Sequence, residues 1–73
     1  MKPSQQAGIR CEEPVFKVFL GEEYSFEWDE SFTPADAVRR LCEIKSRSEL
    51  NTVHAARVLW HQLDEQYQAW KLM

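Results

Sequence analysis

The sequence lacks features that several protein classes require. Its only two glycines, Gly8 and Gly21, lie too far apart to form a glycine-rich loop that cradles phosphate. No run approaches the ~20 apolar residues of a membrane-spanning helix. No apolar stretch follows Lys2 to serve as a signal peptide, and only two cysteines are present, Cys11 and Cys42. The sequence therefore predicts a soluble, cytoplasmic protein with free thiols.

Positive charge is also scarce. Nine Lys and Arg face 12 Asp and Glu, and the net charge of −3 argues against general affinity for nucleic acid or anionic membranes. The two halves differ, because residues 1–36 carry eight acidic and three basic side chains, whereas residues 37–73 carry four and six. We expect a domain with an acidic end and a mildly basic end.

Aromatic residues are plentiful for a chain of 73 residues: three Trp, four Phe and two Tyr. Folding at this length removes only about 60% of the unfolded chain's surface from water, so the core must be small. The aromatic side chains can enlarge that core or fill an interface with a partner.

The pattern along the chain predicts an α+β fold, a single ββαα domain over residues 14–73 after a flexible arm at 1–13. The apolar run 15–20 and the alternating segment 24–28 indicate the strands of a β-hairpin. A three-residue loop would give this hairpin one wholly apolar face that packs on two helices. That face would consist of Phe16, Val18, Leu20, Tyr24, Phe26 and Trp28.

Two helices are predicted after the hairpin, at about 34–45 and 48–72. Thr33 is the expected N-cap of the first, with Pro34 at its first position and Asp36 near the positive end of its dipole. The spacing of Ser46 and Glu49 is typical of a capping box before the second helix. The second helix carries the clearest apolar period, formed by Val53, Ala56, Trp60, Leu63, Tyr67 and Trp70.

No constellation in the sequence indicates catalysis, a cofactor or a metal. His54 and His61 would lie about 10 Å apart along a helix, too far to share one ion without further ligands. Cys42 sits on an apolar stripe, and Glu12 and its neighbour should raise the pKa of Cys11 rather than activate it. We therefore predict a protein that is not an enzyme.

Three sets of residues are candidates for contact with another macromolecule. An acidic docking surface at the hairpin would comprise Glu22, Glu23, Glu27, Asp29 and Glu30, unless these residues serve only as solubilising charge. A nucleic-acid contact on the basic helix and turn would comprise Arg39, Arg40, Lys45 and Arg47. A partner or dimer interface on the second helix would comprise Trp60, Leu63, Tyr67, Trp70 and Met73.

We interpret the chain as a small non-enzymatic interaction module that acts through the aromatic helix surface and the acidic hairpin. Its predicted partner is another protein, and a homodimer is expected because the hairpin and first helix are too short to cover the long second helix. The alternative is a regulator associated with nucleic acid. That alternative is less favoured, because Glu27 and its acidic neighbours would meet phosphates with like charge.

Overall fold

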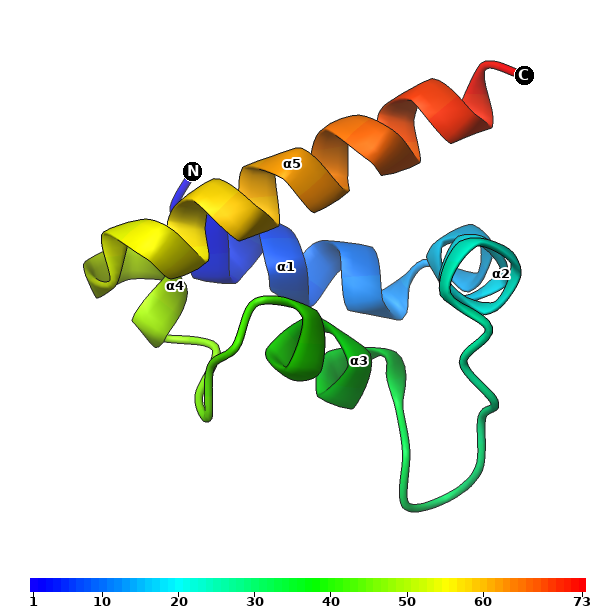
Figure 1. Ribbon diagram of the computed structural model, residues 1–73, viewed down its shortest axis with the longest axis horizontal. Helices are drawn as coiled ribbons and strands as arrows, with labels where there is room; N and C mark the ends of the chain where they lie inside the picture. Colours follow the sequence, from blue (N-terminus) through cyan, green and yellow to red (C-terminus); the bar gives the residue numbers. More distant parts are fainter.

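The computed structural model describes all 73 residues and contains five helices and no strand. The helices are α1 (Pro3–Glu12), α2 (Pro14–Tyr24), α3 (Pro34–Leu41), α4 (Glu49–Thr52) and α5 (His54–Lys71). In Figure 1, α5 runs along the top with α1 beneath it, α3 lies below α1, and α2 is seen end-on at one side. The loop between α2 and α3 extends away from the other elements.

The helices α1 and α5 run parallel and are joined by a ladder of polar contacts. Hydrogen bonds link Gln6 to Trp60 (3.3 Å), Arg10 to Asp64 (3.0 Å) and Glu13 to Tyr67 (2.6 Å). Each pair is separated by the same 54 positions in the sequence, so the two helices keep one register along their contact. The side chains of Arg10 and Asp64, which form an ion pair in this ladder, are both largely shielded from water.

The centre of the core is aromatic and lies between α2 and α5. The ring of Phe16 packs edge-on against Tyr67 at 4.8 Å between centroids and against Trp60 at 6.5 Å. Phe19 reaches Tyr67 at 5.3 Å. All four side chains are at most 1% exposed. Such edge-on pairs add roughly 0.5–1.5 kcal/mol each to the burial of apolar area.

The predicted β-hairpin at 15–20 and 24–28 is wrong, and the fold is all-α rather than α+β. Residues 14–24 form α2, in which Phe16, Phe19 and Leu20 are buried at helical spacing while Val15 and Val18 are exposed. A short apolar run fits a strand and a buried helix face equally well. The helix is favoured here because Pro14 starts it and α5 offers an aromatic surface to its buried face.

The alternation at 24–28 has a structural consequence even without a sheet. α2 ends at Tyr24. The C-cap residue Ser25 has a left-handed φ of 59°, and the chain continues as a loop. The rings of Tyr24, Phe26 and Trp28 follow one another at 6.2 and 6.0 Å between centroids. Alternate side chains of this segment therefore share one side, but no second strand lies opposite them.

The segment 1–13, expected to be a loose arm, contains the ten-residue helix α1. Ala7 is its only fully buried residue, so α1 has almost no apolar period to reveal it in the sequence. Pro3 occupies the first turn, where its missing N–H is harmless. The helix is held in place by its polar ladder to α5 and by a bond from the Ser4 N–H to Asn51 on α4.

The predicted start of α3 is confirmed, but its end is not. The Thr33 N–H and hydroxyl donate to the Asp36 carboxylate at 2.8 and 2.9 Å, which closes a capping box. The helix ends at Leu41 rather than near residue 45. Glu43 adopts a left-handed φ of 58°, which stops the helix and turns Ile44 into the core.

The helix predicted at 48–72 is two helices, α4 and α5. The expected capping contact is present, because Glu49 accepts the Ser46 N–H at 2.8 Å. The break comes at Val53, which is extended at φ −96° and ψ 110°. Thr52 and Val53 are β-branched and weaken the helix there, and the bend lets α4 direct Leu50 into the core.

We expect Trp60→Ala to lower the free energy of unfolding by about 3–5 kcal/mol, because it empties the centre of the core. That is comparable to the whole stability of a small domain. Val58→Ala is the matched control, since Val58 lies on the same helix and is 40% exposed. Urea unfolding followed by far-UV circular dichroism should show a small effect for the control. Equal effects of the two substitutions would contradict this core.

Candidate functional site

The aromatic surface predicted on α5 is largely part of the core. Trp60, Leu63 and Tyr67 are at most 4% exposed, because α1 and α2 cover them. Trp70 is half-buried and Met73 is 93% exposed. Only the C-terminal end of the predicted interface is therefore available to a partner. The two N-terminal helices thus cover part of the α5 surface for which a second copy was expected, whereas Leu72 and Met73 at its end are 89% and 93% exposed.

Three aromatic rings form a half-exposed cluster in the loop between α2 and α3. Phe26, Trp28 and Phe32 lie 5.3–6.0 Å apart between centroids, and each is only partly buried. Lys17 lies over the Trp28 ring at 5.8 Å, and Arg40 lies over Phe32 at 4.8 Å. We call these three rings the loop aromatic cluster. From the sequence, Phe26 and Trp28 are expected in the core, and no exposed aromatic surface is predicted here.

A tight turn holds the loop in shape. The backbones of Asp29 and Phe32 exchange two hydrogen bonds of 3.3 Å, and the Ser31 N–H and hydroxyl both donate to the Asp29 carboxylate at 2.8 Å. The hydrogen bonds from Ser31 lower the pKa of Asp29, which keeps this carboxylate ionised. The loop aromatic cluster is thus presented on a closed turn.

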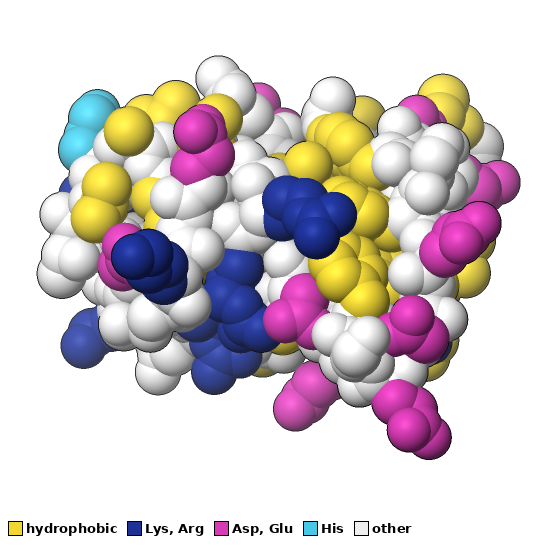
Figure 2. Space-filling view, turned by 60° about the horizontal axis from the view of Figure 1, so that its bottom comes forward, with side chains coloured by type: hydrophobic (Ala, Val, Ile, Leu, Met, Phe, Trp, Pro, Cys, Tyr) yellow, Lys and Arg dark blue, Asp and Glu magenta, His cyan; other side chains and the backbone are white.

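The predicted acidic residues do gather at one end of the molecule, although not on a hairpin. All are exposed, and none makes an ion pair within the chain. Figure 2 shows acidic side chains at the lower right beside an apolar area, whereas most Lys and Arg lie in the left half and one basic side chain lies against the apolar area near the centre. We call this set the acidic rim; it comprises Glu22 and Glu23 in the last turn of α2 and Glu27, Asp29 and Glu30 in the loop.

The predicted basic residues are not all free to contact phosphates. Arg39 is paired with Asp36 within α3, and Arg40 is stacked on the ring of Phe32. Lys45 and Arg47 are exposed on the segment between α3 and α4. Of the four predicted residues, only Lys45 and Arg47 therefore form neither an ion pair nor a contact with an aromatic ring.

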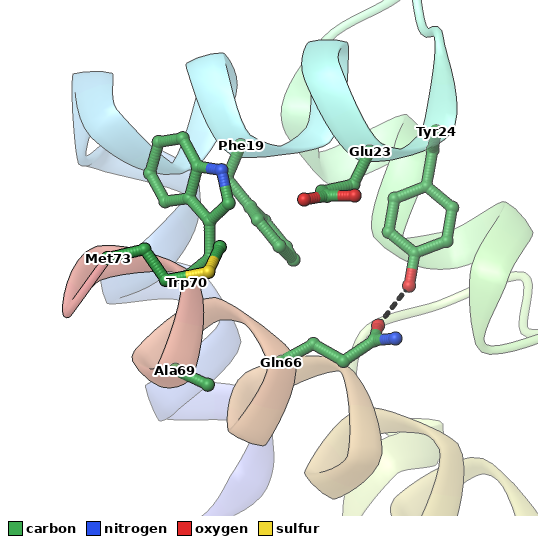
Figure 3. A pocket seen from close by; sticks show the side chains of 7 residues that line it. All are labelled: Phe19, Glu23, Tyr24, Gln66, Ala69, Trp70 and Met73. Atoms are coloured by element: carbon green, nitrogen blue, oxygen red, sulfur yellow. Dashed lines mark hydrogen bonds between the residues drawn. The ribbon is translucent and has the colours of Figure 1, made fainter.

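A cavity of about 280 Å³ opens between the C-terminal ends of α2 and α5. Figure 3 shows the rings of Phe19 and Trp70 and the carboxylate of Glu23 facing one space, with a hydrogen bond from Tyr24 to Gln66 along one side. Of these residues, only Glu23 and Trp70 were candidates from the sequence. The others carry no local signal, because the cavity exists only where two distant helices meet.

No group of three or more His, Cys, Asp or Glu side chains is placed to hold a metal ion. None of the helices is long and apolar enough to cross a membrane. Comparison with known protein families, curated proteins and solved structures found no match.

Burial is the main reason why both thiols are poorly ionised. It raises the pKa of Cys11 and of Cys42 from 9.0 to about 11. Near Cys11 the charges of Arg47 and Arg39 oppose this shift, and Glu12 adds to it only slightly. The raised pKa of Cys11 agrees with the sequence analysis, but its first cause is burial rather than the acidic neighbour.

We expect both thiols to react slowly with iodoacetamide in the folded protein. A pKa raised by about two units leaves about a hundredfold less thiolate at pH 8. The rate should rise about tenfold per pH unit as long as the pH stays below the raised pKa. Mass spectrometry of timed samples checks this, with protein unfolded in urea as the control. A thiol labelled equally fast in both states would contradict the placement of that cysteine.

Proposed function

We propose that the chain is a non-enzymatic module that binds another protein and that its acidic, aromatic end docks a basic segment of that partner. The observation that carries the proposal is the loop aromatic cluster, three half-exposed rings bordered by the unpaired carboxylates of the acidic rim. Aromatic side chains supply large contact area at protein interfaces, and the carboxylates would favour a cationic partner. The free thiols of Cys11 and Cys42 support a reducing, cytoplasmic setting.

The placement of Glu22 and Glu23 is a second argument. Both lie in the last turn of α2, which contains no basic residue to offset them. The C-terminal end of a helix carries partial negative charge, so these carboxylates oppose the helix dipole. Residues that break a local stability rule are expected at functional sites. A cationic partner would relieve this repulsion.

Charge also favours a different protein over a second copy at this end. A two-fold symmetric contact would bring the acidic rim of one molecule against the acidic rim of the other. A homodimer through the far end of α5 is the competing arrangement, and it would use Trp70 and Met73 rather than the residues buried in the core. Light scattering with Trp70→Glu distinguishes a dimer at that end from a monomer.

The alternative function, contact with nucleic acid, is ranked second. Lys45 and Arg47 are exposed, and Figure 2 shows most Lys and Arg side chains in the left half of the face in view. Against it stand the net charge of −3 and the engagement of Arg39 and Arg40 within the chain. Binding of random duplex DNA that weakens steeply with salt would favour this alternative.

The test of docking is affinity capture from the native host with the charge of the rim reversed. Glu27→Lys/Glu30→Lys reverses two charges of the rim and leaves in place Asp29 and Ser31, whose side chains hold the turn. Glu12→Lys/Glu65→Lys is the matched control, because both residues are exposed and the change in net charge is the same. Each bait should be used with untreated and with nuclease-treated lysate.

We expect the wild type and the control to retain a polypeptide that the rim variant loses and that salt elutes. Circular dichroism should show that all three baits are folded. Equal retention by the rim variant and the control would overturn docking at the acidic end. Loss of the captured polypeptide on nuclease treatment would favour the nucleic-acid alternative.

A further inference from the structure

The cavity between α2 and α5 has an apolar wall and a polar rim. Its apolar wall includes Phe19 and Trp70, whose rings lie 5.5 Å apart between centroids, and Tyr24 stands 6.1 Å from Phe19. Met73 lies at its mouth and is 93% exposed. Three aromatic residues and a thioether around one opening form a surface that attracts flat or polarisable groups.

The acceptors at the rim of the cavity are the Glu23 carboxylate and the Tyr24 hydroxyl oxygen, and the donors are the Gln66 amide N–H groups and the Trp70 indole N–H. Glu23 is exposed and forms no ion pair or hydrogen bond with another side chain. The hydroxyl of Tyr24 donates its proton to the Gln66 carbonyl oxygen, so its own oxygen remains available as an acceptor. Figure 3 shows the Glu23 carboxylate on the same side of the cavity mouth as the Phe19 ring. Glu23 is the only charged side chain that lines the cavity, so a ligand with positive charge and hydrogen-bond donors is favoured there.

The cavity is large enough for one side chain and lies at the small end of the range of ligand pockets. Pockets that enclose whole small molecules measure about 300–1,000 Å³, and this one measures about 280 Å³. A guanidinium group is planar and weakly hydrated, it stacks on aromatic faces, and it forks onto a carboxylate with two parallel hydrogen bonds. An ammonium group is strongly hydrated and offers only a point charge.

From this geometry we infer that the cavity binds the guanidinium group of an arginine side chain presented by the basic partner. The inference deepens the proposed function and rests on it for the identity of the partner. The cavity is continuous with the docking surface, because the Tyr24 ring that lines it stacks at 6.2 Å on Phe26 of the loop aromatic cluster. One segment of the partner can therefore place an arginine side chain in the cavity and apolar side chains against the loop aromatic cluster.

The test uses the indole N–H signals of the three tryptophans in an NMR titration of the full chain. Trp70 lines the cavity, whereas Trp60 is bonded to Gln6 in the core and serves as the internal reference. The probes are Nα-acetyl-arginine amide, the matching lysine amide, and the matching citrulline amide. Citrulline keeps the shape of arginine but carries no charge.

We expect the arginine amide to shift the Trp70 signal saturably at millimolar concentration and to leave Trp60 unchanged. The citrulline amide should bind at least about tenfold more weakly, because it loses the charge-assisted bonds to Glu23. The lysine amide should also bind more weakly than arginine. Equal shifts with arginine and citrulline, tighter binding of lysine, or no saturation would each overturn the inference.

Two variants locate the charge that matters. Glu23→Gln should weaken binding of the arginine amide at least about fivefold, whereas Glu22→Gln, which removes the same charge from the same turn outside this cavity, should change it less than about twofold. Equal effects would mean general attraction by the acidic rim and would overturn the site. If the Glu23→Gln variant captures the partner as well as the wild type does, the arginine site in the cavity is rejected. The proposed docking function is not rejected by that result. Arginine binding without any captured partner would reject the proposed docking function.

Discussion

The fold depends on the burial of one side of α5, with Trp60 and Tyr67 at its centre. Their large apolar area is covered from one direction by α1, through the polar ladder at a constant register, and from another by Phe16 and Phe19 of α2. In a domain of this size few other side chains could supply comparable burial. Because α2 must lie across α5 to provide this cover, its C-terminal end is directed outward with two glutamates and the loop that follows.

Some elements could be predicted from the sequence because their signals are local. The N-cap at Thr33 and the apolar period on α5 are properties of residues a few positions apart; Thr33 does cap α3, and the period is buried from Ala56 to Tyr67. The hairpin was wrong because the run 15–20 fits two periods, and only contact with α5 decides between them. α1 was missed because contacts 54 positions away hold it, rather than an apolar stripe of its own.

The candidate site divides in the same way. The acidic rim could be predicted, since charge is visible in the sequence, but its setting could not, because α2 and a loop replace the expected strands. The three alternating rings from Tyr24 were recognised as sharing a side, and they do follow one another, although they lie partly exposed at the edge of the core. The cavity required knowing that Phe19 meets Trp70, and no sequence pattern links those two positions.

The central claim is that the end of the molecule bearing the loop aromatic cluster and the acidic rim contacts a basic protein. Its most direct test is photo-crosslinking in the native host, with benzoylphenylalanine at Val18, which is 54% exposed on α2 beside that end. The same group at Val58 on α5, 40% exposed, is the control. We predict an adduct from Val18 to a peptide rich in Arg and Lys. An adduct formed only from Val58, or one to nucleic acid, would contradict the account.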